Sequence, residues 1–322
     1  MKKTIILGTM LTSVALVASA CGDSSDGDDQ DLFVTIAAGG TSGVYYPIAG
    51  AMANVYGDAG HDVSVQATGA SVENVNLLQS DQAEIAIVMA DTVEQAYEGF
   101  GAFEGEDPQD NLVAIAGLYP NVVQVITTTN SGIESFEDLE GKRVAVGDAN
   151  SGVELNARMI FEAHDMTYDD ISADYLPYGE AIDQMRNGML DAAFVTSGVP
   201  NSAAMDLAST HDVTVVPIES DAMDYLNETY PFFIEDEVPA GTYDNEEDIP
   251  TPSITNLLVP NPSLSDDEVY ELTSLFYDNL ETIQSSHEAA TDIEIDHFQE
   301  GVNIPLHPGA ERYFQEQGLL DE

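Results

Sequence analysis

Short apolar runs alternate with helical segments along most of the chain, and this alternation constrains the fold more than any other feature. Residues 32–37, 63–67 and 85–89 are brief apolar runs of the length expected for strands buried on both faces. Residues 46–56 and 71–79, which lie between these runs, carry apolar side chains at helical spacing. The order β-α-β-α-β predicts a parallel sheet with right-handed crossover connections.

A second α/β unit is expected to begin near residue 131. Two further apolar runs, 112–118 and 122–128, precede it and are separated by Tyr119, Pro120 and Asn121. The pattern then predicts strands and helices at 144–146, 153–163, 180–188, 192–196, 200–209, 213–218, 254–259, 266–282 and 311–317, with a surface loop at 236–250. We therefore predict an α/β protein of two lobes with a cleft between them. Residues 32–125 would form the first lobe and 126–225 the second, and 226–322 would complete the first.

The charge of the chain is extreme, with 59 Asp and Glu against 7 Lys and Arg and a formal net charge of −52. This balance excludes nucleic acid as a partner, because such binding depends on Lys and Arg that neutralise phosphates. Self-repulsion on this scale is tolerated where salt shortens the Debye length to about 3 Å at 1 M. The composition therefore predicts an exported surface adapted to high salt. The alternative is an acidic surface that recruits cations or a basic partner.

Residues 1–20 have the layout of a secretory signal, with Lys2 and Lys3, an apolar run and small residues before Cys21. The run is shorter than the roughly 20 apolar residues that a membrane span needs. The small-residue triplet that ends at Cys21 resembles the bacterial lipobox. We expect Cys21 to be the lipidated first residue of the mature chain, on the outer side of the cytoplasmic membrane; a free or buried thiol is the alternative.

Residues 22–31, which follow Cys21, contain no apolar side chain, so residues 21–31 are predicted to be an acidic tether. The aspartates there do not have the spacing of a calcium-binding loop, and no metal is expected. Because Cys21 is the single cysteine, a disulfide scaffold within the chain and a zinc or iron–sulfur cluster held by cysteines are both excluded.

Five junctions between an expected strand and the helix after it carry small and hydroxyl-bearing residues, at 38–47, 67–74, 89–92, 147–152 and 196–200. Glycines let the backbone approach a ligand closely, and the first turn of a helix has free N–H groups. Ligands in open parallel sheets bind at the carboxyl ends of the strands, where these junctions would meet. We therefore expect the junctions to form a ligand site, although each one alone is also explained as a capped turn.

Signatures of an enzyme are missing from the sequence. It contains no H-E-x-x-H zinc motif and no G-x-S-x-G nucleophile elbow, and the first glycine-rich junction is neither a P-loop nor a G-x-G-x-x-G motif. With 59 carboxylates, neighbouring acid pairs are unavoidable and do not indicate glycosidase chemistry. We expect a binding protein without a cofactor.

The chain resembles the TAXI family, the solute-binding proteins of TRAP (tripartite ATP-independent periplasmic) transporters. The likeness runs from about residue 33 to residue 320. It is carried by residues 37–53, 67–79, 137–158, 191–200 and 304–318, which include the Gly-Thr-x-Gly-x-Tyr-Tyr-Pro-like segment at 40–47 and the His-Pro-Gly-Ala segment at 307–310. The resemblance implies a type II periplasmic-binding-protein-like fold with a hinge between its lobes. It also implies delivery of a small organic acid or amino acid, such as glutamate or 2-oxoglutarate, to a sodium-driven membrane permease.

The expected contacts to this ligand come from both lobes. From the first lobe we expect Gly40, Thr41, Ser42, Tyr45, Thr68, Ser71, Asn74, Asp91 and Tyr119, and from the second Asn150, Ser151, Gly152, Ser197 and Pro200. Asp91 would accept a ligand ammonium group. Because Lys142, Arg143 and Arg158 are expected outside the cleft, backbone N–H groups and hydroxyls would have to hold any carboxylate. The alternatives are a binding protein of an ABC transporter, a ligand sensor on the same fold and, furthest from the pattern, an enzyme.

Overall fold

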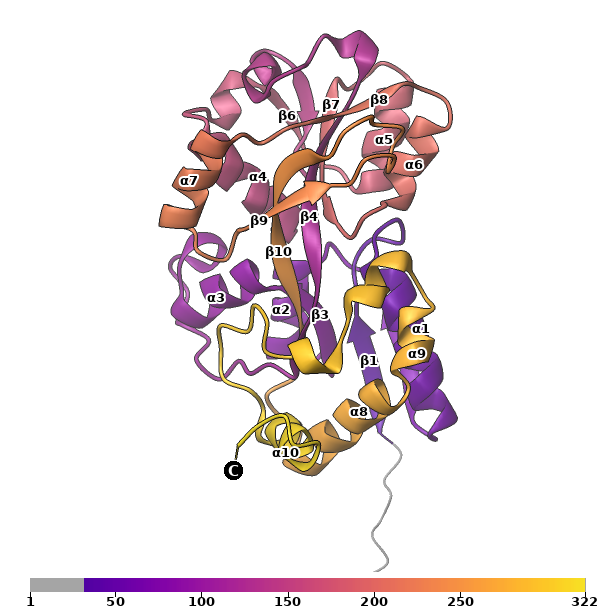
Figure 1. Cartoon of the computed structure of the whole chain (residues 1–322). Helices are drawn as coiled ribbons and strands as arrows, with labels where there is room; N and C mark the ends of the chain where they lie inside the picture. The colour runs from indigo at the N-terminus through magenta and orange to yellow at the C-terminus, as the bar shows by residue number, and fades with distance from the viewer. Residues whose placement is uncertain (1–31, 322) are drawn as a thin grey trace, which may run out of the picture. The chain divides into compact units, whose positions relative to one another are not determined.

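A computed structural model describes residues 32–321, and one ten-stranded sheet organises them in the order β2-β1-β3-β10-β4-β7-β5-β6, with β8 paired to β4 and β9 to β10 (Figure 1). The strands are β1 (Phe33–Ala37), β2 (Asp62–Gln66), β3 (Ile85–Met89), β4 (Ala116–Thr128), β5 (Arg143–Ala145), β6 (Ser172–Asp174), β7 (Ala192–Ser197), β8 (Val213–Val216), β9 (Ile234–Val238) and β10 (Ile249–Pro260). The helices are α1 (Tyr45–Asp58), α2 (Ser71–Gln79), α3 (Ala90–Glu98), α4 (Gly152–Ala163), α5 (Tyr178–Arg186), α6 (Ser202–Ala208), α7 (Ser220–Thr229), α8 (Asp266–Asp278), α9 (Leu280–Gln284) and α10 (Pro308–Glu316).

The first lobe consists of β1, β2 and β3 with α1–α3 and α8–α10. Strand β1 pairs in parallel with both β2 and β3, as the alternating pattern predicts. All five residues of β3 are buried, which explains its continuous apolar sequence. Helix α1 packs Met52 and Tyr56 into a cluster that includes Phe276 of α8 and Phe314 of α10.

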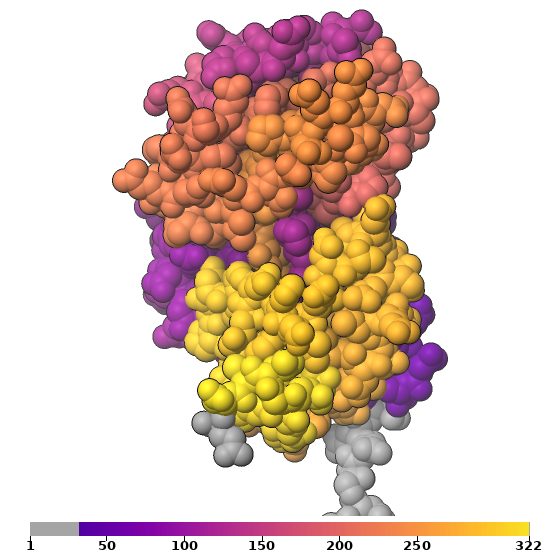
Figure 2. Space-filling model, in the orientation of Figure 1, coloured from indigo at the N-terminus to yellow at the C-terminus, as the bar shows by residue number. Residues whose placement is uncertain are grey.

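The second lobe consists of β5–β9 with α4–α7. Strand β5 lies between β6 and β7 and is parallel to both. The aromatic centre of this lobe is Phe161 of α4, whose ring centroid lies 5.0 Å from that of Phe136 and 5.6 Å from that of Phe194. The surface of the molecule is hollowed between the two lobes (Figure 2).

Two long antiparallel strands, β4 and β10, run through both lobes. The sequence predicts two separate apolar runs at 112–118 and 122–128, and the structure shows that β4 continues across Pro120. Proline lacks the N–H that a strand with partners on both sides would use. Pro120 is accommodated because it pairs with Thr255 of β10 before the first β4 residue that pairs with β7, which is Val122.

The region 226–260 differs from the prediction. The expected surface loop at 236–250 contains the end of β9 and the start of β10, and Val238 and Tyr243 are buried against the second lobe. The chain therefore returns to the first lobe along β10, later than the expected boundary at residue 226. Strand β9 has three consecutive acidic residues, 235–237, between Ile234 and Val238, so a search for apolar runs misses this edge strand. The helix expected at 266–282 is divided between α8 and α9 at Asn279.

No helix within residues 32–321 is long and apolar enough to cross a membrane. The signal sequence, the lipidated Cys21 and the tether expected from the sequence lie outside the described residues.

Candidate functional site

The loops at the carboxyl ends of the parallel strands are held by their own polar side chains. Thr68 Oγ1 donates to Asn74 Oδ1 at 2.6 Å and accepts from the N–H of Ala70 at 3.0 Å, which shapes the start of α2. Ser151 caps α4 by accepting from the N–H of Glu154 at 3.2 Å, and Asn201 caps α6 through the N–H groups of Ala203 and Ala204. Loops of the two lobes, among them those that begin α2 and α4, surround one space.

That space is a cavity of about 60 Å³, counted as volume open to the centre of a water molecule. Its lining comes from both lobes: Gly39, Gly40, Gly43, Val44, Tyr45, Thr68, Gly69, Ala70, Met89 and Asn121, then Asp148, Ser151, Val153, Pro177, Tyr178, Thr196 and Ser197. The first turns or caps of α1, α2, α4 and α5 all reach it.

A hydrogen-bonded chain supports the Tyr45 side of the cavity. The hydroxyl of Tyr45 donates to Asn256 Oδ1 and accepts from Asn121 Nδ2 at 3.2 Å, and Asn256 Nδ2 donates to the carbonyl of Tyr119 at 2.8 Å. Burial raises the pKa of the Tyr45 hydroxyl far above its ordinary value, so this group remains protonated. On the opposite side the Tyr178 hydroxyl donates to the carbonyl of Thr196 at 2.7 Å, which holds the Tyr178 ring in place.

Two polar atoms of the lining have no protein partner. Asn121 is 3% exposed and its Oδ1 accepts no hydrogen bond, and Thr196 is 2% exposed and its Oγ1 makes none, within the part of the chain that the structure describes. Buried polar groups are nearly always hydrogen-bonded, and an unpaired one costs about 1–3 kcal/mol. Both atoms face the cavity wall, where a polar molecule in the cavity could pair with them.

The cavity is electronegative on the side of Asp148. Burial is the main cause of the raised pKa of the Asp148 carboxyl, and the nearby negative charges of Glu73 and Glu180 raise it further. No Lys, Arg or His is among the residues that line the cavity. No cluster of three or more His, Cys, Asp or Glu within residues 32–321 has the arrangement of a metal site.

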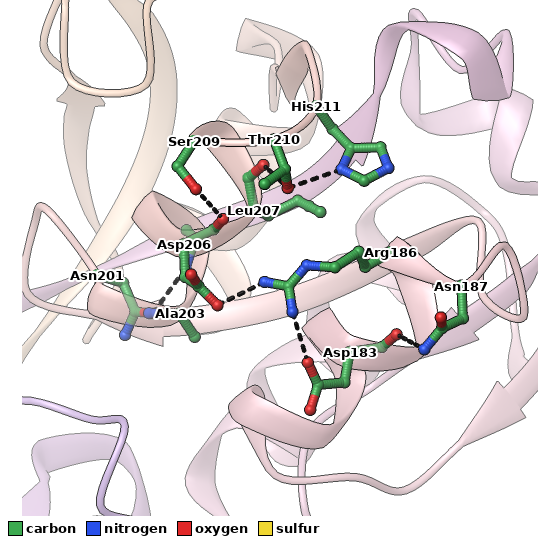
Figure 3. Close-up of polar contacts among 11 residues, drawn as sticks. Asp183, Arg186, Asn187, Asn201, Ala203, Asp206, Leu207, Ser209, Thr210 and His211 are labelled. Carbon is green, nitrogen blue, oxygen red and sulfur yellow. Dashed lines mark hydrogen bonds and ion pairs between the residues drawn. The ribbon is translucent and has the colours of Figure 1, made fainter.

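All five basic residues of the described chain are engaged away from the cavity. Arg186 joins α5 to α6 through the carboxylates of Asp183 and Asp206 (Figure 3). The other four contact acidic side chains or a carbonyl: Lys142 with the carbonyl of Ser131, Arg143 with Asp191, Arg158 with Glu154 and Arg312 with Asp267. As expected, Arg158 pairs within its own helix and does not line the cavity.

Residues 36–318 match the model of a protein family described as NMT1-like. The chain belongs to the NMT1-like family. Several solved structures are similar to this NMT1-like chain in fold. A protein from Bordetella bronchiseptica RB50 is 15% identical, with a TM-score of 0.51 over 89% of this chain and 98% of the other. The alkanesulfonate-binding protein SsuA from Xanthomonas axonopodis pv. citri, bound to MOPS, is 11% identical, with a TM-score of 0.50 over 91% and 96%.

A third similar structure is the ligand-binding component of an ABC-type import system from Staphylococcus aureus with zinc bound. It is 8% identical, with a TM-score of 0.50 over 90% of this chain and 93% of the other. Identities this low show the fold alone. They confirm the predicted α/β fold of the periplasmic-binding-protein type.

Five of the residues expected to contact a ligand line the cavity of the NMT1-like chain: Gly40, Tyr45, Thr68, Ser151 and Ser197. The others lie elsewhere. Thr41 is exposed, and neither Tyr119 nor Pro200 is part of the lining, although the Tyr119 ring is buried nearby against Gly198. Ser71 and Asn74 are buried and bond to the backbone: Ser71 Oγ accepts from the N–H of Met89, and Asn74 Nδ2 donates to the carbonyls of Ala38 and Ile87.

The remaining expected residues join the lobes instead of lining the cavity. The carbonyl of Asn150 accepts from the N–H of Glu73 at 3.3 Å, and the carbonyl of Ser42 accepts from Ser202 Oγ at 3.1 Å. Gly152 lies so close to the first lobe that a Cβ there would overlap the methyl end of Met89. The conformation described is therefore one in which the lobes are in contact.

Asp91 is the clearest difference from the expected site. It does not line the cavity, is 0% exposed, and accepts from Asn156 Nδ2 of the second lobe at 2.9 Å. Burial raises the pKa of its carboxyl to about 7. The carboxylate that does face the cavity is Asp148, which lies in the same glycine-rich junction as Asn150 and Ser151.

Some residues that line the cavity were not in the expected set, and the sequence indicated them to different degrees. Asp148 and Thr196 belong to junctions that the sequence identifies, and Tyr178 is an aromatic residue two positions before an expected helix. No sequence pattern indicated Asn121, because its role depends on the crossing strand β4 and on its contact with Tyr45.

Proposed function

We propose that this chain is an extracytoplasmic solute receptor that encloses a small organic acid or amino acid between its lobes and delivers it to a membrane permease. The observation that carries the proposal is the cavity itself. It is lined from both lobes, four helix starts reach it, and it holds buried polar atoms without protein partners. A ligand there would contact the two lobes at once and so favour their closure.

Strands β4 and β10 would form the hinge, since they pass from one lobe to the other. Closure would be favoured by cross-lobe hydrogen bonds such as Asp91–Asn156 and Ser202–Ser42. The domain division that we propose places 32–115 and 261–321 in the first lobe and 129–248 in the second, with the two crossing strands between them.

The proposed permease is the sodium-driven membrane component of a TRAP transporter, and glutamate and 2-oxoglutarate are the ligand type that the TAXI resemblance implies. The permease of an ABC importer is the second candidate, because the similar structures include the ligand-binding component of such a system. In either case the protein would be exported and anchored through Cys21.

The residues that line the cavity support a binding role over an enzymatic one. Its ionisable side chains are Asp148, Tyr45 and Tyr178, and burial raises the pKa of both tyrosines. No nucleophile beside a general base is found among the lining residues.

Thermal unfolding of the purified protein in about 2 M salt, with and without candidate solutes, tests the proposal. A solute at 100 times its Kd stabilises the folded state by about 2.7 kcal/mol, which is readily measured. Organic acids and amino acids should stabilise the protein, and turnover of the solute should be undetectable. A folded protein that is stabilised by none of these solutes would contradict the proposal. The Ser151→Ala variant should lose affinity, whereas Thr41→Ala, at an exposed position of the first junction, serves as its matched control.

A further inference from the structure

The charge around the cavity restricts what the ligand can be. Asp148 lines it, and Glu73 and Glu180 are near enough to act on Asp148 electrostatically. Glu73 accepts from the N–H of Gly69 at 2.7 Å, so one backbone donor of the lining is already used by a protein carboxylate. A ligand with a net negative charge would enter this field with no basic side chain in the lining to offset it.

Donors for one carboxylate are nevertheless present. Helices α1, α2, α4 and α5, of 14, 9, 12 and 9 residues, all begin at the cavity. The N–H groups of a first helical turn lack partners within the helix and carry partial positive charge. The unpaired Oδ1 of Asn121 adds an acceptor and the Oγ1 of Thr196 a hydroxyl.

The size of the cavity and the apolar part of its lining limit which other groups the ligand can carry. A volume of about 60 Å³ open to the centre of a water molecule suits a compound of few non-hydrogen atoms. Val44, Met89, Val153 and Pro177 supply apolar walls. A long side chain, or one that ends in a second carboxylate, does not fit this description.

We infer that the ligand is a small neutral zwitterion, an α-amino acid with a short apolar side chain, whose ammonium group faces Asp148 and whose carboxylate faces the helix starts. This inference rests on the proposed function and narrows it. Asp148 thereby takes the role that the sequence suggested for Asp91, and dicarboxylic acids are disfavoured as ligands.

Isothermal titration calorimetry of the mature protein in high salt tests the inference with four probes. Alanine carries both charged groups, pyruvate lacks the ammonium, ethylamine lacks the carboxylate, and glutamate adds a second carboxylate. We expect alanine to bind and the other three to bind at least 10-fold more weakly.

Two variants link this preference to Asp148. Asp148→Asn should weaken alanine binding at least 10-fold and leave pyruvate binding unchanged or tighter. Asp110→Asn makes the same charge change at an exposed position outside the lining and should bind alanine as the wild type does. Circular dichroism of each variant establishes that it is folded.

The results that would contradict this inference differ from those that would also contradict the proposed function. Binding of glutamate, pyruvate or ethylamine as tightly as alanine, or an unchanged alanine preference in Asp148→Asn, would overturn the inference and leave the receptor function standing. If no acid or amino acid binds to the folded protein, both the inference and the proposed function are wrong.

Discussion

Asp91 Oδ2 accepts a hydrogen bond from Asn156 Nδ2 at 2.9 Å, and this pair joins the two lobes at a point where both side chains are 0% exposed. Burial raises the pKa of the Asp91 carboxyl from 3.8 to about 7, because the hydrogen bonds from Thr92 and Asn156 offset only part of the cost of burying a carboxylate. We therefore expect the contact between the lobes to depend on pH.

The unfolding free energy should fall as pH rises from about 4 to 7 because of Asp91. A raised pKa means that the folded state binds more protons than the unfolded state over this range, which makes the slope negative. The contribution is up to about 4 kcal/mol, from roughly three units at 1.36 kcal/mol each. Since other carboxylates also titrate, the quantity to measure is the difference between Asp91→Asn and wild type in urea unfolding. The variant should gain stability relative to wild type up to pH 7, and Asp110→Asn should not; parallel curves for Asp91→Asn and wild type would contradict the assignment.

Gly152→Ala should weaken closure. The added Cβ would overlap the Met89 methyl and crowd Ser71 Oγ and Thr92 Oγ1, so the Met89 side chain must move before the lobes make this contact. Ligand affinity should drop, and small-angle scattering should show less compaction than in the wild type when ligand is added. Gly57→Ala is the control, because a Cβ there meets nothing within 4 Å, and it should be neutral or stabilising by up to about 1 kcal/mol. If Gly152→Ala became as compact as the wild type when ligand is added, the close approach of Gly152 to Met89 would not be needed for closure.

Tyr45→Phe should destabilise the protein by about 1–3 kcal/mol. Removal of the hydroxyl leaves Asn256 Oδ1 and Asn121 Nδ2 buried without this partner, and the cost is the desolvation of both. Urea unfolding gives the value, and Tyr46→Phe at a half-buried neighbouring position should change it little. Equal stability of the two variants would show that the network contributes nothing.

Arg186→Gln should have an effect that depends on salt. The guanidinium joins Asp183 and Asp206 at a partly exposed position, where ion pairs are worth about 0–1 kcal/mol. We expect a loss of about 1 kcal/mol in 0.1 M salt and almost none above 2 M, where charges are screened. Unfolding free energies at several salt concentrations provide the measurement. An equal loss at all concentrations would indicate that packing, and not charge, dominates.

Cys21→Ser should release the protein from the membrane. The lipobox-like segment predicts that the lipid is attached at Cys21, and this attachment requires the thiol that serine lacks. Fractionation of cells should move the protein from the membrane to the soluble exported fraction, and the mass of the wild type should include the lipid. Membrane retention of the variant would refute anchoring at Cys21.

Much of this protein follows from its sequence alone. The apolar composition of a run such as 85–89 indicates a buried strand, and a hydroxyl-bearing residue such as Ser151 indicates the start of a helix. Both signals can be recognised from the sequence because strand burial and helix capping depend on a few neighbouring residues. The sequence also predicts that the strand-to-helix junctions meet, and five of the residues expected there line one cavity. The strong acidic bias is likewise a property of composition.

The tertiary structure decided which of these residues meet. Asn121 reaches Tyr45 only because β4 crosses between the lobes, and Asp91 faces Asn156 and not the cavity only because α3 and α4 approach each other. Such contacts join residues 65 to 76 positions apart, and no local pattern encodes the direction in which each side chain points. The acidic strand β9 likewise could not be predicted from its local sequence, because its place at the edge of the sheet comes from its pairing with β10. Local propensity determines the elements, whereas the packing of distant segments determines the surroundings of each charge and therefore what the cavity can bind.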